Sequence, residues 1–387
     1  QLYALSNSLE DWQLQIEDAP HADIFPIRQG MYRWMHRHLK GEELTEVDTA
    51  RAYFEPTELT VFDEMPDDQI NTRIDEEFVP AAEAPPVPSE DGGWHEIRQG
   101  WIDQLNEKTF NGWPSVDQPP AAEAVHETTF GNTRLTTYEF TSQEDINLRM
   151  WVLQEDGSGQ PDSLTVSVLD QDGWQNWLGA LQSALPTGVV DTSVVGPGAH
   201  ATPWPGADGQ ALERITERLS GGRALAVVAP RGIGPTSWSQ ETPGYQIRRS
   251  FMLLGQTRDG MRIWDVRRAV QALQSQSGFV DATVRLEGSG VMAGIAMYAG
   301  IYEPAVDGLD LYSPPSTHRN GPILMNVRKV FDMPQALGLA RSSVENVRIY
   351  GADPAQWTWP RQLNDQMFGG EGLRIVDGER EYVMRDS

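Results

Sequence analysis

Strands alternating with helices are what the hydrophobic and polar positions predict for residues 94–387. Two segments of alternating character, "TRLTTYEFTS" (133–142) and "INLRMWVLQE" (146–155), predict an antiparallel pair of strands. Unbroken apolar runs at 163–171 and 224–230 predict strands that are buried on both faces. Further strands are predicted at "ATVRLEG" (282–288), "VDGLDLY" (306–312), "ENVRIYG" (345–351) and "GLRIVDG" (372–378).

Helical spacing of apolar residues fills the gaps between these strands. It predicts helices at 94–110, 207–222 and 259–276, and a helix rich in small residues after the strand at 282–288. The alternation implies an α/β fold with an open, mostly parallel sheet, right-handed crossovers and flanking helices. No Gly-x-Gly-x-x-Gly follows a first strand and no Walker loop is present, so a nucleotide-binding fold is disfavoured.

A change of composition divides the chain into three parts. The segment "PAAEAPPVPSEDGG" (80–93) is rich in proline and lacks bulky apolar residues, so we expect an extended linker there. It separates residues 1–79 from the large segment 94–387. Residues 1–79 contain a strand-like "ELTVF" (58–62) and one amphipathic helix, too little to bury a sheet, so we expect them to dock on the large segment or on another polypeptide.

Charge and composition exclude several classes of partner. The net charge of −26 disfavours nucleic acid, because phosphates would be repelled. No apolar run approaches the ~18 residues of a membrane span, so no membrane partner is expected. The chain has no cysteine, and its histidines and carboxylates show no metal-ligand spacing. We therefore expect no metal and no cofactor.

Three sequence blocks carry a resemblance to a known family. They are "VVAPRGIGPTSW" (227–238), "RRSFMLLGQTRDGMRIWDVRRAVQAL" (248–273) and "VRLEGSGVMAGIAMYAG" (284–300). Their order and spacing resemble α/β-hydrolases of the acetyl xylan esterase and dienelactone hydrolase type, over about residues 94–387. The resemblance implies a serine esterase fold, an acylated polysaccharide as substrate class, and a secreted or extracytoplasmic location.

The N-terminal part carries a second resemblance. The stretch "DWQLQIEDAPHADIFPIRQGMYRWMHRHLKG" (11–41) is similar to the last strand, histidine loop and final helix of the same type of hydrolase. In that register His21 is the triad base of a first hydrolase unit. Its serine and acid would then come from an upstream segment or another chain. The bland alternative is that His21 is a polar loop residue before an amphipathic helix.

Residues 288–290, Gly-Ser-Gly, occupy the place of the nucleophile elbow, a sharp strand-to-helix turn. The residues two before and two after a nucleophile must be small. With Gly290 at the apex, Gly288 meets the first requirement and Met292 fails the second. With Ser289 at the apex, both neighbours are large. We therefore expect Gly290 at the apex and Ser289 as a turn residue that caps the next helix.

The candidates for the acid and the base of a triad have weaker support from the sequence. Asp353 follows the strand at 345–351, where an acid is expected, although Asp-Pro is also a common turn. No histidine follows His318, for which we expect a loop-packing role. Arg231 is expected to pair with Asp265 as a structural anchor. Tryptophans in predicted loops could stack on sugar rings or simply pack: Trp174, Trp177, Trp204, Trp238, Trp357 and Trp359.

Two hypotheses therefore remain open. In the first, the chain is part of an acetyl xylan esterase-like enzyme whose second hydrolase unit lacks the triad. In the second, residues 94–387 form a non-catalytic pseudo-hydrolase with a structural, oligomerising or glycan-binding role. A unit without serine and histidine cannot follow the acyl-enzyme route.

Overall fold

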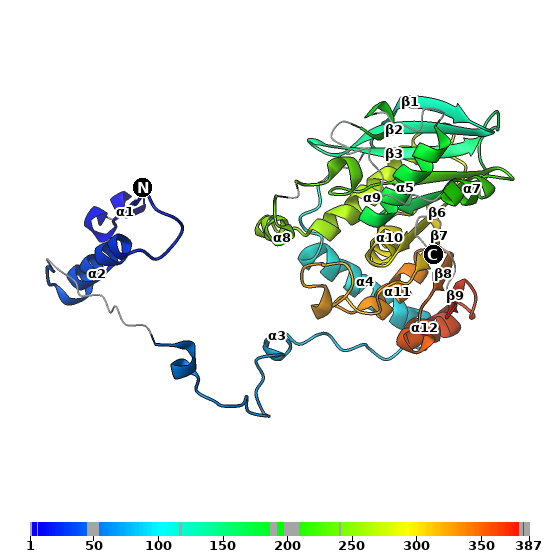
Figure 1. Cartoon of the computed structure of the whole chain (residues 1–387). Coiled ribbons are helices and arrows are strands. Elements are labelled where there is room, and N and C mark those ends of the chain that lie inside the picture. Colours follow the sequence, from blue (N-terminus) through cyan, green and yellow to red (C-terminus); the bar gives the residue numbers. More distant parts are fainter. Residues whose placement is uncertain are drawn as a thin grey trace. The chain divides into compact units, whose positions relative to one another are not determined.

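Two compact units, Gln1–Ile74 and Asp75–Ser387, make up the chain in a computed structural model (Figure 1). Each unit is described by itself. The structure describes residues 2–5, 7–44, 54–115, 118–185, 192–196, 209–239, 241–378 and 382. In this part of the chain no helix is long and apolar enough to cross a membrane.

The first unit has one substantial helix, α2 (Phe25–Lys40). Pro26 lies in its first turn, where the missing N–H costs nothing, and Gly41 ends it at φ 70°. Two short elements precede it: α1 (Leu2–Leu5) and the 3-10 turn η1 (Leu9–Asp11). The stretch that resembles a last strand, residues 12–18, forms no strand.

The strand predicted at 58–62 is wrong. Residues Pro56–Leu59 form a 3-10 turn, η2, instead. A proline at its start and a capping box between Glu55 and Glu58 stabilise the turn, and residues 60–62 have no strand partner. Local capping therefore outweighs the alternation of apolar residues at this place.

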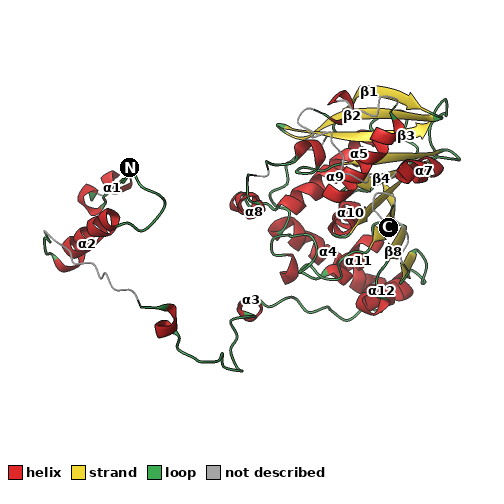
Figure 2. Ribbon diagram, viewed as in Figure 1, coloured by secondary structure: helices red, strands yellow, loops and turns green. Residues whose placement is uncertain are grey.

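The second unit is built on one nine-stranded sheet with the order β1-β2-β3-β5-β4-β6-β7-β8-β9 (Figure 2). The first three strands and their junction with β5 are antiparallel, and every later pairing is parallel. This is the predicted mostly parallel sheet. The strands are β1 (Ala122–Phe130), β2 (Thr133–Gln143), β3 (Ile146–Glu155), β4 (Ser163–Val168), β5 (Arg223–Val228), β6 (Thr283–Ser289), β7 (Val306–Tyr312), β8 (Asn346–Tyr350) and β9 (Leu373–Val376).

Helices flank this sheet, as the alternation predicts (Figure 2). The predicted helices at 94–110, 207–222 and 259–276 are α4 (Asp91–Lys108), α7 (Gly209–Glu217) and α9 (Arg258–Gln274). The glycine-led helix after β6 is α10 (Val291–Tyr302). The remaining helices are α3 (Ile74–Phe78), α5 (Gln171–Ala184), α6 (Thr192–Val195), α8 (Gly244–Leu253), α11 (Met333–Arg341) and α12 (Thr358–Met367).

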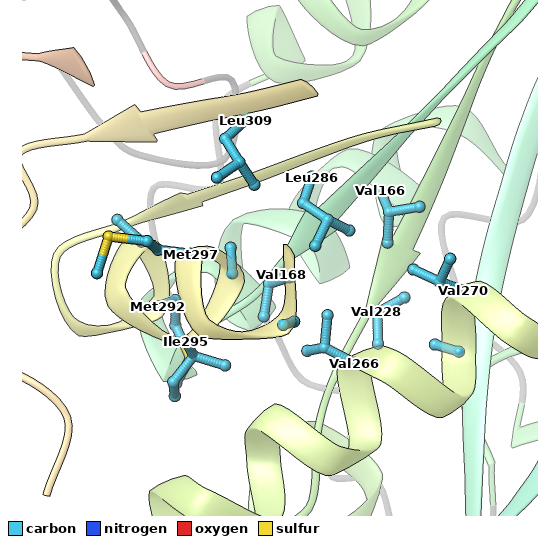
Figure 3. Close-up of a cluster of buried hydrophobic side chains, with 14 of the residues drawn as sticks. Val166, Val168, Val228, Val266, Val270, Leu286, Met292, Ile295, Met297 and Leu309 are labelled. Atoms are coloured by element: carbon cyan, nitrogen blue, oxygen red, sulfur yellow. The ribbon is translucent and has the colours of Figure 1, made fainter. Parts of the chain in front are cut away.

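A dry core joins the central strands to α9 and α10 (Figure 3). Leu286 of β6 points into this core and is fully buried, so it packs strand β6 against helices α9 and α10. Each such side chain contributes about 1.5–3 kcal/mol by burial. The labelled members of the cluster are Val166, Val168, Val228, Val266, Val270, Leu286, Met292, Ile295, Met297 and Leu309.

Arg231 and Asp265 form the expected anchor at the carboxyl end of β5. The Arg231 guanidinium donates from Nε (2.9 Å) and Nη2 (2.7 Å) to the Asp265 carboxylate, and its backbone N–H donates to the same group at 2.9 Å. Ser142 Oγ adds a donor at 2.6 Å. Asp265 is fully buried, so this pair ties the ends of β2 and β5 to helix α9.

Replacing the buried carboxylate should cost far more than an exposed one. We expect Asp265→Ala to lower the free energy of unfolding by about 3–5 kcal/mol, because it leaves the Arg231 charge buried and unpaired. The exposed Asp281→Ala is the matched control and should change it by no more than about 0.5 kcal/mol. Urea unfolding of both variants measures this, and equal losses would contradict the anchor.

Candidate active site

The turn between β6 and α10 has its apex at Gly290. This residue has φ 55° and ψ −125° and is the N-cap of α10. Its N–H donates to the Tyr312 carbonyl at 2.9 Å, which ties the apex to the end of β7. A Cβ built on Gly290 meets no atom within 4 Å. The apex thus has room for a side chain, but only glycine adopts this conformation without strain.

Position 288 requires glycine for a different reason, which is that no space is left there for a side chain. A Cβ there would lie 2.7 Å from the Met292 carbonyl oxygen and 3.0 Å from the Ala293 nitrogen. Strand β6 and helix α10 therefore pass in direct backbone contact. This is the close approach that small residues permit around an elbow nucleophile, and it lies two residues before Gly290.

Ser289 is the last residue of β6 and is buried. Gly290 holds the N-cap position of α10. Ser289 still belongs to the strand and pairs with Tyr312 of β7, so its expected role as a helix cap stays a prediction.

A buried polar cluster lies on β6 directly before the turn. Glu287 is fully buried and accepts both hydrogen bonds of the Arg218 guanidinium, at 2.9 and 2.7 Å. Tyr382, which comes after β9 in the chain, places its hydroxyl 2.8 Å from Ser167 Oγ and donates to the Val168 carbonyl at 3.3 Å. Burial and the nearby Glu287 carboxylate raise the pKa of Tyr382 well above its usual value.

Tyr382 lies beyond the last strand, in the part of the chain where a triad histidine is expected. A hydrolase brings its triad base to the carboxyl ends of the central strands from this part of the chain. Here a phenol reaches the end of β4, and its ring contacts that of Tyr312 at 5.0 Å. The hydroxyl is held between Ser167 and the Val168 carbonyl, so Tyr382 packs against the end of β4.

The remaining predicted site residues, Asp353 and His21, belong to different units and are described one by one. Asp353 follows β8 as predicted and is exposed, with Oδ1 accepting the Ala355 N–H at 2.9 Å as the cap of η5 (Pro354–Trp357). His21 lies in the loop before α2 and is exposed. His36 lies 3.7 Å from Glu42, and His38 lies 3.6 Å from Asp11.

His318 packs a loop, as expected. Its Nδ1 lies 2.9 Å from Asp332 Oδ1 and its Nε2 lies 2.8 Å from the Tyr298 hydroxyl, so both ring nitrogens are engaged. Burial alone would raise the pKa of Asp332. Hydrogen bonds from the His318 side chain and backbone, Thr317 and Met333 outweigh burial and hold that pKa well below its usual range. The contacts of His318 with Asp332 and Tyr298 fix the loop between β7 and α11.

The predicted tryptophans are mostly core residues. Trp174, Trp177 and Trp357 are at most 2% exposed, and Trp359 packs on other indoles. Trp238 is 36% exposed, and Trp204 lies outside the described residues. The prediction that Trp174 and Trp177 lie in a loop is wrong, because both residues lie on helix α5. A sugar-stacking surface built from these residues is therefore not supported.

A pocket of about 450 Å³ is lined by Val79, His318, Ile323, Arg328 and neighbouring residues, and none of Gly288, Ser289 and Gly290 belongs to it. Among all the residues that the structure describes, no group of three or more histidine, aspartate or glutamate side chains could hold a metal ion.

Comparison with solved structures supplies the fold. An assigned acetyl xylan esterase from Bacteroides fragilis superposes with a TM-score of 0.55 at 13% identity, covering 73% of this chain and 74% of its own. A glucuronoyl esterase from Solibacter usitatus gives 0.55 at 12% identity, covering 79% and 94%. A promiscuous CE15 esterase from a marine bacterial metagenome gives 0.52 at 11% identity, covering 76% and 89%.

The second unit has the α/β-hydrolase fold. No family model matches the chain, and no curated protein matches its sequence. The identities to the solved structures are low, so the likeness extends to the hydrolase fold alone. In this fold β6 is the strand that leads to the nucleophile elbow.

The two glycines of the elbow should respond differently to alanine. Gly288→Ala forces a Cβ against backbone atoms and should lower the free energy of unfolding by about 3 kcal/mol. Gly290→Ala meets open space and pays only for its positive φ, about 1 kcal/mol. Urea unfolding compares the two, and equal tolerance of both changes would contradict the close approach of β6 and α10.

Proposed function

We propose that the chain is part of a carbohydrate esterase in which this hydrolase unit performs no acyl transfer itself. The observation that carries the proposal is Gly290 at the apex of the elbow. Acyl transfer by this fold requires a nucleophile at the apex and a base within hydrogen-bond reach of it. Glycine offers no nucleophile, and the sequence contains no histidine after His318.

The esterase part of the proposal rests on likeness. Acetyl xylan esterase and glucuronoyl esterase structures share the fold over most of the second unit. Acylated polysaccharide is accordingly the substrate class we propose for the whole enzyme. The nucleophile then comes from outside this chain.

The first unit supports a partner of this kind. Its only buried side chain among the described residues is Gln29. Large apolar side chains are exposed instead, among them Leu5 at 86%, Ile16 at 80% and Leu39 at 72%. So many exposed apolar groups mark an interaction surface. We propose that this surface joins a first hydrolase sheet, contributed by an upstream segment or another chain, and that His21 is its triad base.

A second candidate function, a purely structural pseudo-hydrolase, differs only in whether any ester is hydrolysed when the partner is present. Helix α2 favours a protein partner in both cases. It carries Arg28, Arg33, Arg37 and Lys40 and no acidic residue, in a chain of net charge −26. An acidic apolar surface is the complement of such a helix.

The chain by itself should not hydrolyse p-nitrophenyl acetate above the uncatalysed rate. Ser289→Ala should leave that rate unchanged, and Gly290→Ser should not raise it, because the sequence has no histidine after His318 to act as the base of the new hydroxyl. A burst of p-nitrophenol from the natural chain that disappears in Ser289→Ala would overturn the proposal.

A thiol reports whether the apex is reachable in this test. The chain has no cysteine, so Gly290→Cys carries a single thiol, and Ser289→Cys is its buried partner control. We expect Ellman's reagent to modify Cys at the apex at least about ten-fold faster than at the strand end. An apex that reacts shows that an inactive Gly290→Ser lacks a base rather than access.

The first unit should not fold independently. We expect a fragment of residues 1–74 to show no cooperative thermal transition by circular dichroism, because it buries almost no apolar surface. A fragment carrying Leu5→Ser, Ile16→Ser and Leu39→Ser is the control and should behave alike apart from better solubility. A sharp, reversible unfolding transition of the natural fragment would contradict the need for a partner.

A further inference from the structure

The proline-rich segment, residues 80–88, is part of the second unit and lies on the body of that unit in a regular way. Ala82, Pro85 and Pro88 are half-buried, whereas Ala81, Glu83, Ala84 and Pro86 are exposed. This is burial at every third residue. A polyproline II helix has three residues per turn, so one face of such a helix is covered. Val87 is also half-buried and packs against the core.

Two backbone groups of the segment are bound by the body of the unit. The Ala82 N–H donates to the Arg328 carbonyl at 2.7 Å. The Trp359 indole Nε1–H donates to the Pro85 carbonyl at 2.7 Å. A polyproline helix makes no internal hydrogen bonds, so its carbonyls are available to such a donor.

An aromatic cluster supports the indole that makes this contact. The Trp359 ring lies 5.7 Å from that of Trp101 and 6.3 Å from that of Trp94, and Trp101 lies 5.0 Å from Phe331. Trp94, Trp101 and Phe331 are buried, so Trp359 is held in a fixed orientation by helices α4 and α12 and the segment before α11.

We infer that Trp359 and its neighbours form a polyproline-binding groove, whose resident ligand is the chain's own segment 80–88. Aromatic-lined grooves with a side-chain donor to a proline-rich ligand are a recurrent mode of peptide recognition. The ligand class is therefore a proline-rich peptide in the polyproline II conformation. This inference is independent of the proposed esterase function. It also means that residues 82–88 are a fixed strap rather than a free linker.

A peptide added in trans tests the groove. In the full chain, residues 82–88 are replaced by alternating glycine and serine, and a fluorescein-labelled peptide of residues 79–90 is titrated while anisotropy is recorded. We expect saturable binding to this variant and at least about ten-fold weaker binding to the natural chain, whose groove is occupied. A peptide with its four prolines replaced by glycine should not bind. Equal binding of the two peptides, or none, would overturn the inference.

Trp359→Phe keeps a ring in place and removes the donor. In the chain whose residues 82–88 are replaced by glycine and serine, Trp359→Phe should weaken binding of the labelled peptide about five- to ten-fold, which is the effect of one lost hydrogen bond. In the otherwise natural chain it should speed proteolysis within residues 80–90 by a similar factor. Unchanged proteolysis of that segment, with an unchanged melting temperature, would show that the groove does not hold it.

Discussion

The close approach of strand β6 to the first turn of helix α10 is the constraint on which the hydrolase unit depends. The approach requires Gly288, and it places Gly290 at a positive φ where the chain must reverse direction. Residues before the turn supply the centre of the sheet, and residues after it supply the helix that packs on the core. This geometry stabilises the fold whether or not the apex carries a nucleophile.

Three carboxylates around the sheet are held in ion pairs or hydrogen bonds within the unit. Glu287 is engaged by Arg218, Asp265 by Arg231, and Asp332 by His318. Each of these carboxylates is matched to a donor in a fixed geometry. The edge of the sheet where hydrolases place their reactive groups is thus held by internal bonds.

Periodicity predicts the strands from β2 onward and the main helices, since burial on one or both faces leaves a direct imprint on the sequence. The glycine elbow follows from the resemblance to hydrolases, and β1 (Ala122–Phe130) is not predicted. The Arg231–Asp265 pair could be predicted because a buried charge needs a partner of opposite charge. Long-range contacts left no such imprint. Nothing in the sequence near Tyr382 indicates that its hydroxyl meets Ser167, and the tryptophans on α5 were assigned to a loop. The segment at 58–62 failed for the opposite reason, because local capping overrode its alternation.

The strap also has a bearing on how the molecule comes to be folded. Pro85 and the indole that binds it are separated by 274 positions, and Arg98 of helix α4 bonds to Ser342 across 244. During synthesis the strap and α4 emerge first, and their receptor is completed near the end. Until then the indole rings of α4 are exposed to solvent. Exposed apolar surface of this kind is what chaperones recognise in nascent chains. Closure of these long loops is therefore the late, entropically costly step that completes the unit.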